Sequence, residues 1–343
     1  MTDRITGPAA DLGGTPETAH TVKPGQAGPP AADARGGLAA YVRLAKLDIY
    51  DYYIGLPLVW ALLAPGDRWQ PGRIGLLVLI LLAEVAVVAA MVGFDDITGH
   101  RDGSDAANYG ADAARRRLAR KPLVAGTLTE PQALRFAWAA TGLGAVLWTL
   151  AVAAAPYRPG WAIVLAAVCF VASVQYSWGL KISYRGFQEI FLIGLGVGWV
   201  LVPYGLLTGE VSAPILVQAV LFGFGPMLFG LYSNTNDAAG DRAAGRITVA
   251  ALVSARGNAV FIVAATVVAG LLIVAAPLMG AAHWWFPIAL APVLIMRAAH
   301  LSIGSVGGDI LRARRIAIRA HRVTVVLLIG ANLAAFALHG AVA

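Results

Sequence analysis

The stretch that decides the fold is LLVLILLAEVAVVAAMVGFDDITGHRDGSD, residues 76–105. Apart from Glu84 it is apolar as far as Phe94, and about 20 such residues are enough for a helix to cross a bilayer. Four aspartates then follow within eleven positions, namely Asp95, Asp96, Asp102 and Asp105. A hydrophobic run that ends in so dense a group of carboxylates predicts a transmembrane helix whose polar end carries chemistry.

The composition of the whole chain agrees with a membrane location. Of its 343 residues, 58% are hydrophobic and only 13% are charged. A soluble domain cannot bury that much apolar surface, so we predict an all-α integral membrane protein. The net charge of +7 then reports orientation rather than a nucleic-acid partner. The single cysteine, Cys169, lies in an apolar run and predicts neither a disulfide nor a thiolate metal site.

Nine apolar runs are predicted to be transmembrane helices. The fourth and eighth are short, and the first begins with polar residues that include Asp48 and Asp51. The runs are 38–64, 74–94, 133–155, 161–177, 187–207, 213–233, 258–279, 283–300 and 321–341. The expected organisation is a nine-helix membrane domain over 37–343. Residues 1–36, which have no apolar core, form a disordered cytosolic tail in this interpretation.

Lysine and arginine predict the orientation of the helices. If the N-terminus is cytoplasmic, all but three of the 26 Lys and Arg residues fall on the cytoplasmic side; the three are Arg68, Arg73 and Arg158. This positive-inside bias supports an odd number of helices. We therefore expect a multi-pass protein of the inner cell membrane whose polar cap faces the cytoplasm. The basic stretch at 307–322 is predicted to be an interfacial helix on anionic headgroups.

The sixth apolar run ends much as the second does, in LYSNTNDAAGDRAAGRIT at 231–248. Asp237 and Asp241 are four residues apart, so they share one face of a helix. Such like charges are tolerated when a divalent cation lies between them, and Mg²⁺ accepts a few carboxylates together with waters and phosphates. The two Asp-rich ends therefore predict half-sites that hold Mg²⁺ on a diphosphate. Solvated helix ends are the alternative.

Basic and amide side chains are predicted at the same face, where they could neutralise a departing diphosphate through charge-assisted hydrogen bonds. The basic candidates are Arg43, Lys46, Arg120, Lys121, Lys181 and Arg185. Lys181 is favoured because it stands between two turn signals, outside any run of charge. Asn234 and Asn236 flank the second motif and could orient its carboxylates or contact phosphate. Orientation anchors and helix caps are the alternative roles.

Three segments carry a family resemblance: NDAAGDRAAGRIT at 236–248, YSWGLKISYRGFQEI at 176–190 and ARKPLVAG at 119–126. They resemble the second Asp-rich motif, the Tyr-Ser…Lys…Arg-Gly…Glu loop and the Arg-Pro-Leu…Gly loop of the UbiA superfamily of intramembrane prenyltransferases. The similarity runs from about residue 38 to the C-terminus. It implies a nine-helix bundle with a central prenyl pocket, and Mg²⁺-dependent ionisation of an isoprenoid diphosphate.

The first Asp-rich stretch departs from the family pattern, Asn-Asp-x-x-Asp-x-x-x-Asp. Aligned on Asp95 and Asp96, the chain has Gly99 and Gly103 at the next two aspartate positions. Two other aspartates lie close by, and menaquinone-type members also carry Gly-x-Asp there. The expected Mg²⁺ ligands are Asp95, Asp96, Asp102, Asp105, Asp237 and Asp241. Some terpene-cyclising members have Gly or Ala at the middle position, which keeps cyclisation open.

Catalytic roles follow from this resemblance and from the depth of the side chains. Lys181, with Arg185, is expected to stabilise the leaving diphosphate, and Tyr176 opens the loop that faces it. Glu84 lies mid-span, where an ionisable group suggests function; it could stabilise a cation, accept a proton, or bind a neighbouring helix while protonated. Aromatic rings suited to a carbocation are Tyr50, Tyr52, Tyr53, Trp199, Tyr204, Phe222, Phe224, Phe229 and Tyr232.

Transfer of the prenyl group to a lipophilic acceptor, either aromatic or a quinone precursor, is the favoured reaction. A terpene cyclase of the same fold, which uses the polyene as its own nucleophile, is the alternative. Intramembrane acids and internal repeats also occur in transporters, but there they lie near the midplane. The acids here gather at one face, with only Glu84 deep, which disfavours transport.

Overall fold

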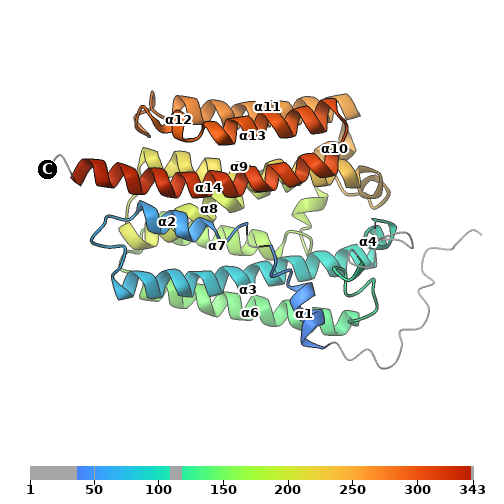
Figure 1. The fold of residues 1–343 in the computed structure, drawn as a ribbon. Coiled ribbons are helices and arrows are strands. Elements are labelled where there is room, and N and C mark those ends of the chain that lie inside the picture. The colour runs from blue at the N-terminus through green and yellow to red at the C-terminus, as the bar shows by residue number, and fades with distance from the viewer. Residues whose placement is uncertain (1–36, 50, 109–117, 341–343) are drawn as a thin grey trace, which may run out of the picture.

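The computed structural model of the chain describes residues 37–49, 51–108 and 118–340, and all regular structure in this part is helical. The long helices lie lengthwise beside one another in Figure 1. In chain order the elements are α1 (Leu38–Leu44), α2 (Gly55–Leu62), α3 (Pro71–Arg101), α4 (Ser104–Asn108), α6 (Glu130–Ala154), α7 (Gly160–Val174), the 3₁₀ turn η1 (Ile182–Tyr184), α8 (Gln188–Thr208), α9 (Ala213–Ala243), α10 (Val249–Leu252), α11 (Ala255–Ala275), α12 (Phe286–Ala289), α13 (Ala291–Leu301), the π turn η2 (Ser302–Val306) and α14 (Ile310–Gly340).

The two Asp-rich stretches are the ends of unusually long helices. Both α3 and α9 have 31 residues and begin with a proline in their first turn. At 1.5 Å per residue each is about 46 Å long, whereas the hydrocarbon core of a bilayer is about 30 Å thick. The last turns, which carry the aspartates, can therefore extend beyond the hydrocarbon. The short helices that follow, α4 and α10, lie at the same end of the bundle in Figure 1.

Close helix contacts fix the position of these ends. A Cβ atom on Gly196 of α8 would lie 2.6 Å from the Cα atom of Gly223 of α9, so the two backbones touch there. Gly144 of α6 packs in the same way on α3, because a Cβ atom on this glycine would lie 3.0 Å from Cγ2 of Val87. Such close packing leaves little freedom for α3 and α9 to slide along their neighbours.

The predicted number of nine transmembrane helices is not confirmed. Six helices of the described residues are long and apolar enough to cross a membrane; they are α3, α6, α8, α9, α11 and α14. Two shorter apolar helices cover Gly160–Val174 and Ala291–Val306. The prediction of one continuous helix over 38–64 is wrong, because the segment divides into α1 and α2. Lys46, two residues after the end of α1, has a left-handed backbone with φ of 47°.

The break in the first predicted span serves a polar contact. Asp51, between α1 and α2, accepts hydrogen bonds from Nε and Nη2 of Arg322 at 2.7 and 3.1 Å. A buried carboxylate is costly without a charged partner, and Arg322 supplies that partner here. Asp51 is in fact buried, and the ion pair ties the segment to α14.

The separate interfacial helix predicted over 307–322 is also wrong. From Ile310 onwards these residues belong to α14, which continues without a break through the ninth predicted span. Its first turns place Arg312, Arg314, Arg315 and Arg319 on the surface, while the alanines between them are buried. The basic stretch is therefore the polar end of a transmembrane helix. The predicted tail at 1–36 and Tyr50 lie outside the described residues.

Candidate active site

Asp96 is the centre of the first carboxylate cluster, which we define as Asp95, Asp96, Asp102 and Asp105. Its side chain is 1% exposed, and Oδ1 accepts hydrogen bonds from Nζ of Lys46 at 2.7 Å and Nζ of Lys121 at 2.8 Å. The second oxygen, Oδ2, is buried without a hydrogen-bond partner. Two of the three lysines predicted at this face, Lys46 and Lys121, thus bind one oxygen of this carboxylate, and its other oxygen is left for a further ligand.

Asp105 occupies the space that a side chain at position 99 would fill. A Cβ atom on Gly99 would lie 2.7 Å from Cγ of Asp105. The carboxylate also pairs with Nζ of Lys121 at 2.7 Å, and its Oδ2 has no partner. Burial, together with the nearby carboxylates, raises the pKa of Asp105 to about 6 against the opposing effect of Lys121. Burial would lower the pKa of Lys121, but Asp96 and Asp105 raise it above its ordinary value.

Asp95 points toward the loop that follows α7. Its Oδ1 accepts a hydrogen bond of 2.6 Å from Oγ of Ser177, which also lies 3.0 Å from Oγ of Ser183. Thr98, one turn further along α3, donates to the carbonyl of Ser177 at 2.8 Å. The end of α3 is therefore hydrogen-bonded to the 176–190 segment through both a side chain and the backbone.

The second carboxylate cluster is Asp237 and Asp241, one turn apart on α9. Asp241 is buried and lies 3.4 Å from Oγ1 of Thr248, which begins α10. Asp237 is half-buried and accepts a hydrogen bond of 2.8 Å from the neighbouring Asn236. The prediction that these two aspartates lie one turn apart on one helix is confirmed.

Arg246 joins the two clusters. Its Nη1 lies 3.8 Å from Oδ1 of Asp95, and its backbone N–H donates to the carbonyl of Asp241 at 2.8 Å. Nη2 donates to the hydroxyl of Tyr176 at 3.2 Å, and the guanidinium lies over the Tyr184 ring at 5.2 Å. Burial alone would lower the pKa of Arg246, but the interactions with Tyr176, Asp95 and Asp241 raise it, so the residue is a fixed cation.

Sequence reasoning missed Arg246 and also Tyr184. The hydroxyl of Tyr184 donates to Oδ2 of Asp102 at 2.6 Å, and burial together with this hydrogen bond raises its pKa. Arg246 looked like one more positive-inside residue of a basic loop. The available signal was its position five residues after Asp241, inside the Gly-Arg-x-Thr end of the motif.

The loop residues predicted to act on the diphosphate lie at the rim of this network. Lys181 is exposed, has a left-handed backbone with φ of 51°, and holds its Nζ 5.3 Å from the centre of the Tyr184 ring. Arg185 is also exposed, and its backbone pairs with Ile247 in a short parallel bridge. The bridge connects the two loops on which Tyr176 and Arg246 meet.

The remaining predicted contacts are more dispersed. Arg120 forms a 2.7 Å ion pair with Asp48 at the surface, and Arg43 is exposed on α1. Asn234 is buried; it accepts from Gln188 at 3.1 Å and donates to Glu189 at 3.2 Å. Its amide therefore links α8 to α9, which favours a positioning role over direct contact with phosphate.

Glu84 is fully buried inside the bundle, eleven residues and about 17 Å along α3 from Asp95. Neither of its oxygens has a hydrogen-bond partner in the described part of the chain, and the same holds for the hydroxyl of Tyr53. The Tyr53 ring stacks on Trp199 at 6.5 Å, and Tyr52 packs edge-on against the same indole at 5.2 Å. Tyr52, Tyr53 and Trp199 therefore pack together inside the bundle, and Tyr53 is within electrostatic reach of Glu84.

The carboxylate clusters offer oxygen ligands for Mg²⁺ but, in the described residues, do not form a complete binding site for it. In the residues that the structure describes, no three His, Cys, Asp or Glu side chains converge closely enough to enclose a metal ion. Mg²⁺ is commonly held by one or two carboxylates together with waters and substrate phosphates, so a complete cage is not required. The unpartnered Oδ2 atoms of Asp96 and Asp105 are buried oxygen donors of the right kind.

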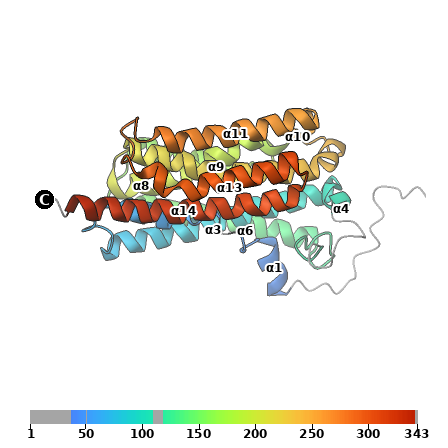
Figure 2. The same cartoon turned by 45° about the horizontal axis from the view of Figure 1, so that its top comes forward.

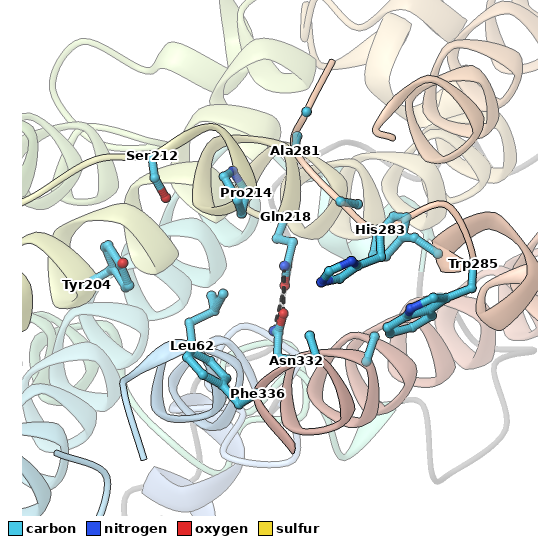
Figure 3. A pocket seen from close by; sticks show the side chains of 15 residues that line it. Leu62, Tyr204, Ser212, Pro214, Gln218, Ala281, His283, Trp285, Asn332 and Phe336 are labelled. Atoms are coloured by element: carbon cyan, nitrogen blue, oxygen red, sulfur yellow. Dashed lines mark hydrogen bonds between the residues drawn. The ribbon is translucent and has the colours of Figure 1, made fainter. Parts of the chain in front are cut away.

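A cavity of about 600 Å³ lies at the opposite end of the bundle (Figure 3). Gln218 and Asn332 exchange two hydrogen bonds, of 2.9 and 2.8 Å, across it, and Trp285 and Phe336 line its sides. Gln218 is 19 residues from Asp237, or about 29 Å along α9. The cavity is therefore remote from the carboxylates, and the central prenyl pocket stays a prediction.

Comparison with known proteins supports the architecture. A family model described as "UbiA prenyltransferase family" matches residues 54–304. No curated protein matches the chain. The chain is similar in fold to a digeranylgeranylglyceryl phosphate synthase structure, with a TM-score of 0.62 and 15% identity over 86% of this chain and 98% of that one. It also resembles a UbiA homologue from Archaeoglobus fulgidus bound to DMAPP and Mg²⁺, with a TM-score of 0.59 and 13% identity over 84% and 99% of the two chains.

A third similar structure is the apo form of a UbiA homologue from Aeropyrum pernix K1, with a TM-score of 0.59 and 15% identity over 84% of this chain and 98% of that one. At these identities the structures show a shared fold, while the family model covers most of the sequence. The fold and the paired carboxylate clusters define a multi-pass membrane protein of the prenyltransferase class. The chain belongs to the UbiA prenyltransferase family.

Proposed function

We propose that the protein ionises an isoprenoid diphosphate with the help of Mg²⁺ and transfers the prenyl group to a lipophilic acceptor. The observation that carries the proposal is the junction at Arg246, which brings the ends of α3 and α9 together at one end of the bundle. Two carboxylate clusters that face each other across a fixed cation suit a polyanionic ligand bound through metal ions. Similar structures that hold DMAPP or GPP with Mg²⁺ support this substrate class.

Each group at the junction has a role in this reaction. Asp96 and Asp105, through their unpartnered oxygens, would hold Mg²⁺ on one side, and Asp237 and Asp241 would hold it on the other. When bound, Mg²⁺ supplies Lewis-acid stabilisation of the charge that develops on the diphosphate as the allylic C–O bond breaks. Asp95 and Asp102 keep the end of α3 in position through Ser177 and Tyr184.

Cationic side chains take up the charge of the leaving group. Arg246 is fixed between the clusters, and Lys121 lies against the first of them. Lys181 stands at the rim, where its flexible chain can reach a bound phosphate by a charge-assisted hydrogen bond. The Tyr176 ring, packed 4.7 Å from Phe191, offers an aromatic face just below Arg246 to the allylic cation.

The proposed topology places the carboxylate clusters at the cytoplasmic face of the inner cell membrane. The distribution of Lys and Arg supports this orientation. The prenyl tail would then lie among the helices below Asp95, sheltered from water in the predicted central pocket. A lipophilic acceptor would reach the cation from the bilayer, which is the reason for preferring transfer to an aromatic or quinone-precursor molecule.

Cyclisation of the polyene is the second candidate. The unpartnered Glu84 and Tyr53, beside the aromatic pair of Tyr52 and Trp199, favour it because a deep acid or base could remove the last proton of a cyclised cation. In this reaction the C–O bond breaks, a distal double bond attacks C1, and a proton leaves to Glu84. No acceptor is consumed, so the product is a hydrocarbon.

The test uses purified protein in detergent with Mg²⁺ and geranylgeranyl diphosphate. Diphosphate release is followed together with gas chromatography and mass spectrometry of the organic extract. Turnover that requires an added aromatic or quinone-precursor acceptor would support transfer. A cyclic hydrocarbon formed without acceptor would establish the cyclase instead. Failure to release diphosphate from isoprenoid diphosphates of any length would sink both.

A further inference from the structure

A second group of polar side chains lies inside the bundle, away from the carboxylates. Arg297 and His300 on α13 and His321 on α14 are 5%, 0% and 3% exposed. We call these three residues the buried basic cluster. Helices α13 and α14 lie side by side in Figure 2, and α14 also packs on α9. Polar residues at such depth are costly in a membrane protein and are usually functional.

The three side chains line one small cavity and each leaves a nitrogen unpartnered. Nη1 of Arg297, Nε2 of His300 and Nδ1 of His321 are buried and have no hydrogen-bond partner in the described residues. The rest of the wall is formed by apolar or small residues, namely Leu221, Gly225, Leu228, Ala317 and Ala320, and by Thr324. The cavity has room for about one water-sized particle.

The charge around this cavity does not balance. Asp51 is the nearby carboxylate, and it is engaged by the two-pronged ion pair with Arg322. No carboxylate of the described residues forms an ion pair with Arg297, although its guanidinium is charged at any physiological pH. A buried, uncompensated cation costs several kcal/mol even after relaxation. One further negative charge at the cavity would neutralise it.

The hydrogen bonds around the cavity determine which N–H groups face a bound anion. The hydroxyl of Tyr232 lies 2.9 Å from Nδ1 of His300 and 3.1 Å from the His300 carbonyl oxygen, so its single proton can go to either acceptor. An anion in the cavity favours the arrangement in which the hydroxyl donates to Nδ1, because Nε2 then carries the imidazole proton and offers an N–H to the cavity. On the opposite wall a Cβ atom on Gly225 would collide with the imidazole of His321, so glycine is needed for the ring to pack against α9. Arg297 and His300 then supply two donors to one small acceptor.

We propose that the buried basic cluster binds a small inorganic anion, with chloride as the physiological type. The cavity is too small for a diphosphate, and Leu228, the lining residue of α9 nearest to Asp237 in the sequence, is nine residues, or about 14 Å along the helix, from it. The site is thus distinct from the carboxylate clusters and does not depend on the proposed function. The bound anion neutralises Arg297 and connects α9, α13 and α14.

His321 makes this binding sensitive to protons. Its Nε2 lies 2.9 Å from the carbonyl of Asp51 and must donate to it, so Nδ1 carries an N–H only when the ring is protonated. Burial opposes a charge on the ring, and the charged and titratable groups around it are Asp51, Arg322, Arg297 and, in the same cavity wall, His300. A proton on Nδ1 adds a third donor to the cavity, so chloride binds more tightly as the pH falls.

The experiment measures the thermal unfolding midpoint of the whole purified chain in detergent, titrated with sodium chloride against sodium gluconate at constant ionic strength. We expect a saturable rise in Tm of roughly 3 °C once chloride exceeds its dissociation constant tenfold. The rise should be larger at pH 6 than at pH 8. Arg297→Met should lose it, whereas Arg314→Met, which removes an exposed arginine of α14, should keep it.

Arg297→Met removes a buried charge, so its own Tm in gluconate should equal or exceed that of the unmodified chain. If this variant does not fold, His300→Gln replaces it and should weaken the chloride response at least threefold. Bromide soaked into crystals should give an anomalous peak beside Arg297. A chloride response that is absent, or equal in all variants, would overturn the proposal and leave a buried water as the occupant.

Discussion

The two carboxylate clusters end helices of the same length, yet they hold their charge in different ways. In the first, Asp96 and Asp105 are buried and share the ammonium group of Lys121, while Lys46 adds a second cation. In the second, Asp237 is half-exposed and bound to the adjacent Asn236. The buried carboxylates of the first cluster are thus neutralised by lysines, whereas the buried Asp241 of the second lies 3.4 Å from the Thr248 hydroxyl and forms no ion pair among the described residues.

This difference suggests a division of labour. Buried carboxylates with fixed cationic partners cannot reorganise cheaply, so the first cluster sets the position of a metal ion and of the reacting carbon. The carboxylates of α9, which have no such ion pair among the described residues, are freer to adjust to the diphosphate as it enters. Substitutions in the first cluster should therefore impair chemistry, and those at the connection between the clusters should impair their alignment.

The largest effect is expected from Asp96→Asn. The amide keeps the size of the side chain but removes the charge that Lys46 and Lys121 neutralise, and it weakens the metal ligand at Oδ2. We expect diphosphate release to fall by about 10³-fold at saturating substrate. Asp48→Asn, which removes the exposed partner of Arg120, is the matched control and should change little. Retention of wild-type turnover by Asp96→Asn would contradict the division of labour.

Moving the carboxylate of Asp105 to position 99 tests whether Asp105 is a metal ligand of the first cluster. Because Asp105 fills the place of a side chain at position 99, Asp105→Ala should lower activity about 10²-fold. Gly99→Asp alone should also be impaired, since the new side chain collides with Asp105. The double variant Gly99→Asp/Asp105→Ala should recover at least a tenth of the activity and the Mg²⁺ affinity measured by calorimetry. No recovery, with both single variants folded, would show that Asp105 is not a replacement ligand.

Much of this arrangement could be predicted from the sequence, because hydrophobic length and charge distribution act locally. The apolar runs before Asp95 and Asp237 predicted helices that end in carboxylates, and the four-residue spacing of Asp237 and Asp241 predicted a shared face. Both features follow from the helical period alone. The chain's membership of the UbiA prenyltransferase family was likewise indicated by the order of its motifs and is now confirmed.

The contacts that organise the site could not be predicted in this way. Lys46 and Lys121 meet Asp96 across 50 and 25 residues of chain, and Arg246 reaches Asp95 from another helix–loop unit. Such pairs depend on how helices pack, which no local pattern encodes. The break between α1 and α2 was missed for the same reason, since it serves the ion pair of Asp51 with the distant Arg322.

The connection between the clusters is tested by Arg246→Met. Removal of the guanidinium separates Asp95 from the 241–248 segment and leaves Tyr176 without its partner. We expect diphosphate release to fall roughly 30-fold, with partial recovery in Arg246→Lys, which keeps the charge but loses the fork geometry. Arg256→Met, which removes an exposed arginine of α11, serves as the control. Equal activity in the Met and Lys variants would mean that the charge of Arg246 is irrelevant to the reaction.

The smallest effect is expected at the edge of the first cluster. Tyr184→Phe removes the hydroxyl that donates to Asp102 at 2.6 Å but keeps the ring on which Arg246 lies. Because one hydrogen bond to a partly solvated carboxylate contributes little net free energy, turnover should fall only about threefold. The Mg²⁺ concentration for half-maximal rate should rise, since the end of α3, which carries Asp96, is held less firmly without the Tyr184–Asp102 hydrogen bond. Tyr157→Phe, which changes an exposed tyrosine beside Arg73, should leave both values unchanged. A loss of activity in Tyr184→Phe as large as that in Asp96→Asn would show that Asp102 is as important to the reaction as Asp96.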